Sequence, residues 1–139
     1  MRYVGLDVGD RRIGVAVSDV SGLIANAVGN VERLGYDFEA DVQKTADKVL
    51  ELGGESVVVG LPKNMNGTLG PRAEKTKRLA EMLKERTEIP IILWDERLTT
   101  VSAHSLMNET NVRGQKRKDS VDSISAAYIL QGYLDSLKL

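Results

Sequence analysis

The order of strand-like and helical segments limits the fold of this chain more than any other feature of its sequence. Three apolar runs follow one another closely at the start, separated by short turns: Met1–Asp7, Arg12–Ser18 and Ile24–Val31. This spacing predicts an antiparallel meander. Helical and strand-like periods then alternate, which is typical of parallel strand pairing. We therefore expect an α/β fold built on a mixed sheet, with helices on both faces.

The alternating part of the chain contains the remaining elements. They are expected as a helix that follows from Phe38 and ends at Gly53-Gly54, a strand Ser56–Gly60, a helix that opens at Pro71, a strand Ile91–Trp94, a short helix capped by Thr99 or Thr100, and a helix from about Ser120 to Leu137. Leu50 and Leu137 are expected on the inner faces of their helices. Trp94 is expected in the core rather than on a base-stacking surface.

Length and composition exclude several classes of protein. With 139 residues, the chain has a size typical of one domain, so we expect a single domain over residues 1–139. It contains no cysteine and one histidine, which excludes disulfides and sites made of thiolates or several histidines. Oxygen ligands would therefore hold any metal, which favours Mg²⁺ or Mn²⁺. We see no leader peptide and no apolar run of the ~20 residues that span a bilayer, so we expect a cytoplasmic protein without membrane contact.

Acidic residues stand where open α/β sheets place their chemistry, at the ends of predicted strands and at a helix start. Asp7 ends the first strand, and Asp122 lies one turn before Ala126 on the apolar stripe of the last helix, where a lone carboxylate is costly. Asp95 and Glu96 both follow the strand Ile91–Trp94. Because neighbouring strand residues point to opposite faces, at most one of these two reaches a shared site.

The acids would meet at one edge of the sheet if their strands are neighbours. Carboxylates without histidine or cysteine are the ligand set for two divalent cations about 3.5–4 Å apart, which hydrolyse phosphodiesters. Structural explanations also exist. Asp7 can bond the backbone of its own turn, and Arg97 can form an ion pair with either preceding acid. Asp122 can be an acid that the helix N-terminus stabilises, or a partner of Arg117 or Lys118. Asp119 is expected to cap the last helix, although it too can join the site.

Four segments, in order along the chain, resemble the YqgF/RuvX family of Holliday-junction-resolvase-like proteins in the RNase H-like superfamily. They are Gly5-Leu6-Asp7-Val8-Gly9 with Arg12-Ile13-Gly14-Val15-Ala16, then Gly60-Leu61-Pro62 with Asn66-Gly67-Thr68, then Asp95-Glu96-Arg97-Leu98-Thr99-Thr100, and Asp122 with Ser125-Ala126-Ala127 and Ile129-Leu130. The resemblance covers essentially the whole chain. It implies an RNase H-like, five-stranded mixed sheet whose first three strands are antiparallel. It also implies a nuclease with a two-metal site for Mg²⁺ or Mn²⁺, in which Asp7, Glu96 and Asp122 are the catalytic and metal-binding acids.

The function implied by the resemblance is that of a metal-dependent endonuclease in maturation of the 5′ end of pre-16S rRNA. Its partners would be structured RNA and pre-ribosomal particles, and the protein would be a monomer or a homodimer. Three alternatives stay open: a Holliday junction resolvase acting on four-way DNA, a non-catalytic nucleic-acid-binding assembly factor, and a phosphate-handling relative of the actin and sugar-kinase ATPases. RuvC-like resolvases carry an acid after their fourth strand, whereas residues 61–68 hold none.

Polar and basic residues near these acids are candidates for contacts with nucleic acid. The candidates are Arg12, Asn64, Asn66, Thr68, Arg97, Arg113, Lys116, Arg117 and Lys118. The last four would form a flap over phosphates, and each contact would add salt-dependent affinity. The segment Leu61–Thr68 equally suits a plain polar turn. A second basic cluster, Arg72, Lys75, Lys77 and Arg78, borders the acids in sequence, although most such clusters are solvated faces.

Overall fold

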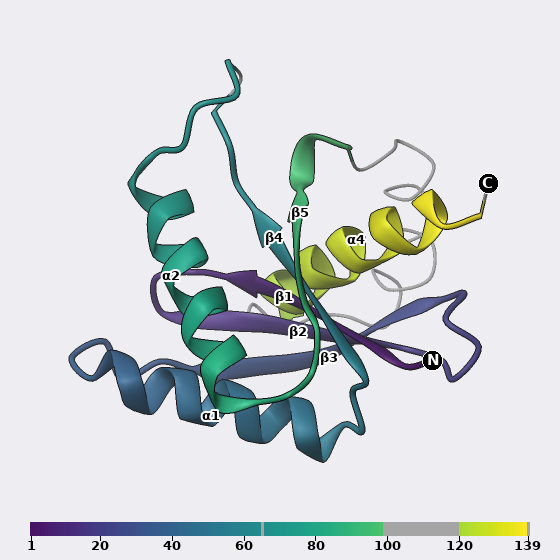
Figure 1. The fold of residues 1–139 in the computed structure, drawn as a ribbon, viewed down its shortest axis with the longest axis horizontal. Helices are drawn as coiled ribbons and strands as arrows, with labels where there is room; N and C mark the ends of the chain where they lie inside the picture. The colour runs from purple at the N-terminus through teal and green to yellow at the C-terminus, as the bar shows by residue number, and fades with distance from the viewer. Residues whose placement is uncertain (65, 99–119, 139) are drawn as a thin grey trace.

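The computed structural model describes residues 1–64, 66–98 and 120–138, with the backbone alone at 120–122 (Figure 1). Its elements are β1 (Tyr3–Val8), β2 (Arg12–Ser18), β3 (Ala25–Glu32), α1 (Phe38–Glu51), β4 (Ser56–Leu61), α2 (Pro71–Arg86), β5 (Ile91–Asp95), the 3₁₀ turn η1 (Glu96–Leu98) and α4 (Ser120–Ser136). The sheet has the order β3-β2-β1-β4-β5. Strands β1, β2 and β3 pair antiparallel, and β4 pairs parallel with both β1 and β5. The predicted mixed sheet with an antiparallel first half is confirmed.

Helices cover both faces of this sheet, as expected: α1 and α2 lie on one side and α4 on the other (Figure 1). Side chains of β1 alternate between the two layers. Val4, Leu6 and Val8 are buried in a cluster with apolar residues of α1 and α2, whereas Gly5 lies against α4. Asp7 has the same orientation as Gly5 and therefore belongs to the face that α4 covers.

Close packing of α4 on β1 depends on a residue without a side chain. A Cβ atom on Gly5 would stand 2.7 Å from Cβ of Leu130 and 3.0 Å from the carbonyl oxygen of Ala126. Two residues before Gly5 on the same face of the strand, the ring of Tyr3 meets the ring of Tyr133 edge to face, at 5.8 Å between centroids. Moving along β1 from Tyr3 to Gly5 thus moves back along α4, toward the start of that helix.

Several predicted boundaries and inner faces need correction. Strand β1 extends to Val8, so Asp7 lies inside the strand rather than at its end. Leu50 is 62% exposed, because the buried face of α1 instead follows Val42, Ala46 and Val49 at helical spacing. Leu137 is 52% exposed, because α4 ends one residue before it.

Other sequence-based expectations are confirmed or lie outside the described residues. Trp94 packs in the α4-side cluster and meets Tyr133 edge to face at 5.5 Å, as expected of a core residue. Pro71 is the first residue of α2. The short helix expected after Thr99 or Thr100 falls in a stretch that the structure does not describe. Within the described ranges, no helix has the length and apolar character needed to cross a membrane.

Candidate active site

The backbone places Asp7 and Asp122 at the same end of the β1–α4 layer. Gly5 faces the carbonyl of Ala126. Asp7 lies two residues further along the strand, about 7 Å, and Asp122 lies four residues earlier in the helix, about 6 Å. These two shifts run in the same direction, so Asp7 is level with the first turn of α4. The Asp7 side chain is largely buried, with 9% of the residue exposed.

The neighbouring acids Asp95 and Glu96 have different surroundings. Asp95 is held by Arg97, whose Nη2 donates to Oδ2 at 2.7 Å, and Lys63 adds a second cation at 4.0 Å. The hydrogen bond from Arg97 holds the pKa of Asp95 below its ordinary value. Glu96 instead continues the alternation of β5, in which Trp94 faces α4. The structure therefore separates the two acids, with Asp95 in an ion pair and Glu96 on the side of Asp7.

A glycine provides the space between Glu96 and Asp7. Continuing the β1–β4 register by one residue places Gly60 beside Asp7, in the strand that separates β1 from β5. A Cβ atom on Gly60 would stand 3.0 Å from Oε2 of Glu96 and 2.5 Å from Cδ1 of Ile129. The Glu96 carboxylate thus lies over the bare backbone of β4, toward Asp7.

Glu96 carries a buried oxygen atom without a hydrogen-bond partner among the described residues. This atom is Oε2, the one that lies over Gly60. Burial raises the pKa of Glu96, the negative charge of Asp7 raises it further, and the positive charge of Arg72 opposes this shift. An ionised carboxylate in this position lacks the donors that normally accompany a buried charge.

Arg72 reaches this acid pair although the sequence-based site did not include it. It lies in the first turn of α2, and its Nη2 atom donates to Oδ1 of Asp7 and to the carbonyl oxygen of Val8, both at 3.3 Å. The Arg72 side chain is 55% exposed, so the cation touches both the acids and solvent. Its membership of a basic cluster beside Pro71 was the available signal. Sequence alone did not show that the start of α2 reaches the end of β1.

The predicted nucleic-acid contacts in the β4–α2 loop form a hydrogen-bonded turn. Asn64 donates to Oγ1 of Thr68 at 3.0 Å, and Oγ1 of Thr68 donates to Oδ1 of Asn66 at 2.6 Å. Gly67 has the positive φ of 87° that such a turn requires. Arg97 approaches the carbonyl oxygen of Asn64 at 3.5 Å. These polar side chains therefore shape the loop, as a plain polar turn does, and their contact with nucleic acid stays a prediction.

Of the other predicted residues, Arg12 lies at the start of β2 with a described ion pair, and the rest fall outside the described part. Arg12 forms a salt bridge with Glu32 at 3.3 Å, at the start of β2. The residues expected in a phosphate flap and at the helix cap fall in the stretch 99–119, which is not described: Arg113, Lys116, Arg117, Lys118 and Asp119. Of Asp122, only the backbone is described.

The donor set of this site fits a divalent cation. Asp7 and Glu96 are hard oxygen ligands, the charge of Asp7 raises the pKa of Glu96, and Oε2 of Glu96 is buried without a donor among the described residues. A cation removes both the repulsion and the missing partner. Among side chains that the structure describes, no group of three or more acids or histidines forms a metal site. A third ligand would have to come from elsewhere, and the register places Asp122 at this end of the layer.

Comparison with known proteins gives a match over nearly the whole chain. The model of a family described as RuvX, Holliday junction resolvase, matches residues 1–136. A Clostridium tetani protein named "Putative pre-16S rRNA nuclease" is 51% identical over 137 residues, which covers 99% of this chain and 98% of the relative. A Clostridium novyi protein of the same name is also 51% identical over 137 residues, covering 99% and 100% of the two chains.

Solved structures with the same fold include two resolvases bound to DNA junctions. The RuvC protein of T. thermophilus, in complex with a Holliday junction substrate, is 14% identical with a TM-score of 0.60, covering 98% of this chain and 96% of that one. The Fowlpox virus resolvase, in complex with Holliday junction DNA, is 11% identical with a TM-score of 0.65, and each chain is covered completely. At such low identity the likeness concerns the fold, which is RNase H-like as expected.

Proposed function

Since this chain belongs to the RuvX family, we propose that it is a divalent-metal-dependent endonuclease that hydrolyses phosphodiester bonds in the 5′-end maturation of pre-16S rRNA. The observation that carries the proposal is the buried Glu96 oxygen, which lies over Gly60 on the side of Asp7 and has no hydrogen-bond partner in the part of the chain that the structure describes. Relatives that are half identical along their full length are named as nucleases of this RNA, which supports the substrate. The unit that acts would be the single domain formed by residues 1–139.

Asp7 and Glu96 are the residues that would hold Mg²⁺ or Mn²⁺, with Asp122 as the third ligand. When bound, such cations supply an activated water and stabilise the leaving oxygen in phosphodiester hydrolysis. The protein contributes fixed carboxylates: β1 orients Asp7, and Gly60 leaves the room into which Glu96 extends. A rigid sheet edge preorganises these charges, so little reorganisation is needed during the reaction.

Arg72 supplies the positive charge of the protein itself at this site. Its contact with Asp7 partly neutralises the acid pair, and its exposed portion faces the solvent from which a phosphate would approach. An arginine in such a position can bind a phosphate oxygen with charge-assisted hydrogen bonds. We propose that Arg72 shifts between these two partners, the acid pair without substrate and a backbone phosphate with it.

A Holliday junction resolvase is the second candidate, because the family model carries that description. The chemistry would be the same, hydrolysis of a phosphodiester by carboxylate-held metal. The two candidates differ in the shape and sugar of the substrate, which the described residues do not distinguish. A side-by-side comparison of substrates is therefore part of the test.

The test is cleavage of a pre-16S rRNA 5′ fragment and of a four-way DNA junction, each with Mg²⁺, Mn²⁺ or chelator. Wild type is compared with Asp7→Asn and with Asp47→Asn, a matched change on the exposed face of α1. We expect metal-dependent cutting of the RNA that Asp7→Asn abolishes and Asp47→Asn leaves intact. Cutting of the junction alone would favour the resolvase. Cutting that survives in Asp7→Asn would refute the site, and binding without any cutting would favour an assembly factor.

A further inference from the structure

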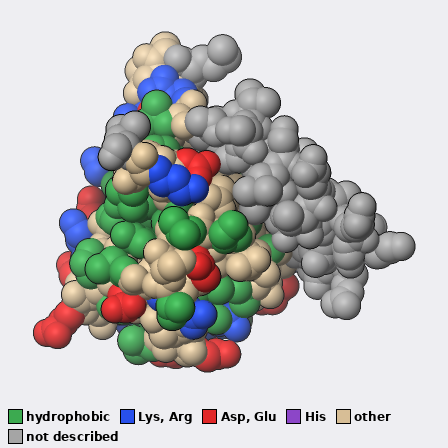
Figure 2. Space-filling view, turned by 90° about the vertical axis from the view of Figure 1, so that its right-hand side faces the viewer, with side chains coloured by type: hydrophobic (Ala, Val, Ile, Leu, Met, Phe, Trp, Pro, Cys, Tyr) green, Lys and Arg blue, Asp and Glu red, His purple; other side chains and the backbone are tan. Residues whose placement is uncertain are grey.

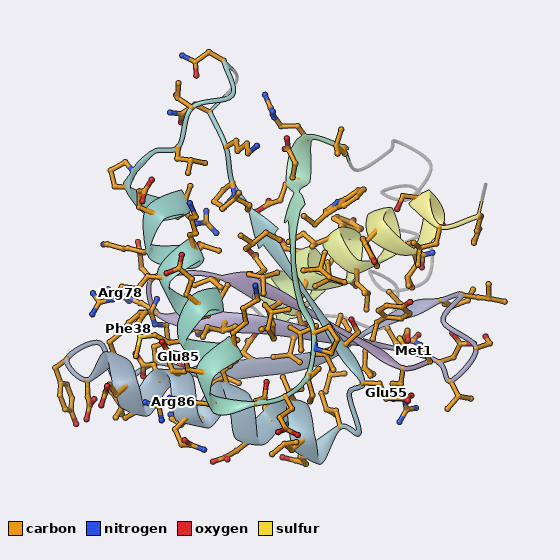
Figure 3. The ribbon with its side chains drawn as sticks, viewed as in Figure 1. Met1, Phe38, Glu55, Arg78, Glu85 and Arg86 are labelled. Atoms are coloured by element: carbon orange, nitrogen blue, oxygen red, sulfur yellow. The ribbon has the colours of Figure 1, made fainter. Side chains whose placement is uncertain are left out.

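A hollow with several charged residues in its lining lies between α2 and the loop that leads from β3 to α1. Its volume is about 370 Å³, within the range of ligand-binding pockets. It is lined by Asp10, Arg33, Gly35, Phe38, Lys75 and Arg78. Figure 3 shows Arg78 and Phe38 side by side, where α2 passes the start of α1. By contrast, acidic and basic side chains are interspersed among hydrophobic ones on the described part of the face seen in Figure 2.

One cation of the hollow has a structural role. Arg33 donates from Nη1 to the carbonyl oxygen of Gly9 at 2.6 Å and pairs through Nε with Asp41 at 3.3 Å. Both side chains are buried, with 11% of Arg33 and 1% of Asp41 exposed. Arg33 therefore fixes the β1–β2 turn against α1, and its charge is largely neutralised.

The other two cations have no acidic partner among the described residues. Lys75 and Arg78 are both exposed on α2, and neither forms a salt bridge there. The guanidinium of Arg78 lies over the ring of Phe38 at 4.9 Å, and that of Arg33 lies at 5.9 Å from the same ring. Stacking on the ring holds Arg78 in place while its N–H groups stay available at the edge of the plane. Two exposed cations, one of them held by the Phe38 ring, suit an anionic group.

The hollow and the acid pair are separated only by the β1–β2 turn. Arg72 donates to the carbonyl oxygen of Val8 from the side of the active site, and Arg33 donates to that of Gly9 from the side of the hollow. Arg78 lies six positions after Arg72 along α2, which is about 9 Å of helix axis. A strand that reaches from the acid pair to the hollow therefore follows α2 for less than two turns.

We propose that this hollow binds a backbone phosphate of the substrate strand through Lys75 and Arg78, close to the bond that is cut. The inference rests on the proposed nuclease function, because it takes the ligand to be the same strand. Tyr36, 86% exposed in the loop beside the hollow, offers an aromatic face next to these cations, a combination typical of single-strand binding. Asp10 at the rim opposes the phosphate, so the contact is weak and the strand can be released.

The test measures binding of a labelled 12-nucleotide single-stranded RNA at several salt concentrations, in full-length Asp7→Asn protein with Mg²⁺. The variant Lys75→Gln/Arg78→Gln is compared with Lys77→Gln/Lys84→Gln, which removes the same charge from the opposite flank of α2, about 200° around the helix. All four side chains are exposed, and thermal unfolding verifies that each variant is folded. We expect the hollow variant to bind about two- to fivefold more weakly. The slope of log K against log salt concentration should be smaller in magnitude by about 0.7, the value for one phosphate of a single strand.

Each outcome decides the proposal. Equal loss in both variants, or no loss in either, would overturn it, whereas loss confined to the hollow variant supports it. Asp10→Asn should tighten binding, and weaker binding would contradict the phosphate assignment. AMP and inorganic phosphate are added as competitors, and displacement of the RNA by AMP at a concentration at which inorganic phosphate has no effect would identify a nucleotide site instead. If wild type cuts RNA and the hollow variant binds and cuts it normally, only this inference fails. If wild type cuts nothing, the nuclease proposal fails, and the binding comparison still decides whether the hollow binds a phosphate of the strand.

Discussion

Replacing Glu96 by Gln should make the metal-free protein more stable while removing its activity. Within residues 1–64, 66–98 and 120–138, no donor meets the buried oxygen of the Glu96 carboxylate, whose pKa the charge of Asp7 raises. An unsatisfied buried polar group costs about 1–3 kcal/mol. Gln keeps the shape but removes the charge, and its amide keeps part of that cost, so we expect a gain of about 1 kcal/mol. For a chain of this length, this corresponds to a rise in Tm of roughly 3–5 °C.

The gain should depend on pH in a defined direction. Burial and the charge of Asp7 raise the pKa of Glu96 in the folded protein. The folded state therefore holds the Glu96 proton more tightly than the unfolded state does, and the stability that this residue contributes is lost as the pH rises through the raised pKa. Glu96→Gln has no ionisable group at this position and therefore does not lose stability in this pH range. The difference in Tm between Glu96→Gln and wild type should be small near pH 4 and should grow toward neutral pH.

Thermal unfolding in chelator and in Mg²⁺, from pH 4 to 8, measures both effects. A ligand at ten times its Kd stabilises the folded state by about 1.4 kcal/mol, so Mg²⁺ should raise the Tm of wild type but have little effect on Glu96→Gln. Asp47→Asn is the matched control, because that carboxylate is exposed on α1. A variant that is less stable than wild type in chelator at neutral pH would refute the reasoning, since the carboxylate would then stabilise the fold.

Three further substitutions test the packing and charge around the acids. Gly5→Ala should destabilise the fold by about 1–3 kcal/mol, because its Cβ would overlap the α4 backbone; denaturant unfolding measures this, and a neutral effect would contradict the close packing. Gly60→Ala should lower Mg²⁺ affinity, measured by calorimetry, because the new methyl group occupies the space of the Glu96 carboxylate; unchanged affinity would place the metal elsewhere. Arg72→Gln should lower the free energy of unfolding in chelator by less than about 1 kcal/mol, because the ion pair with Asp7 is half exposed; denaturant unfolding measures this. It should also weaken RNA cleavage in Mg²⁺, and full activity would exclude a phosphate contact.

The sheet could be predicted from the sequence because its signals are local. Short turns between the first three strands fix the meander, and β-branched runs between amphipathic helices indicate parallel strands. Alternation along β5 also explains why Glu96 and Asp95 differ, although sequence alone did not show which face lies against α4. The part of the site that follows from strand order, with Asp7 and Glu96 on either side of β4, was within reach of the sequence.

Features that depend on the packing of distant elements were not within reach. Arg72 meets Asp7 across 65 positions of sequence, and only the angle of α2 on the sheet brings them together. The sequence also did not show why position 60 needs a glycine. In the structure, the side chains of Ile129 and Glu96 occupy the space that a Cβ atom on Gly60 would need. Leu50 was expected inside because it borders the apolar stripe of α1. Packing against the sheet buries the side of the stripe that Val42, Ala46 and Val49 form and leaves Leu50 exposed.

Binding of Mn²⁺, followed by electron paramagnetic resonance, tests most directly that Asp7 and Glu96 form a metal site. Wild type is titrated beside Asp7→Asn, Glu96→Gln and the control Asp47→Asn. The account predicts saturable binding by wild type and the control, and at least a tenfold (about 1.4 kcal/mol) loss of affinity in both site variants. Equal binding by all four proteins would contradict it, because the metal would then be held without these carboxylates.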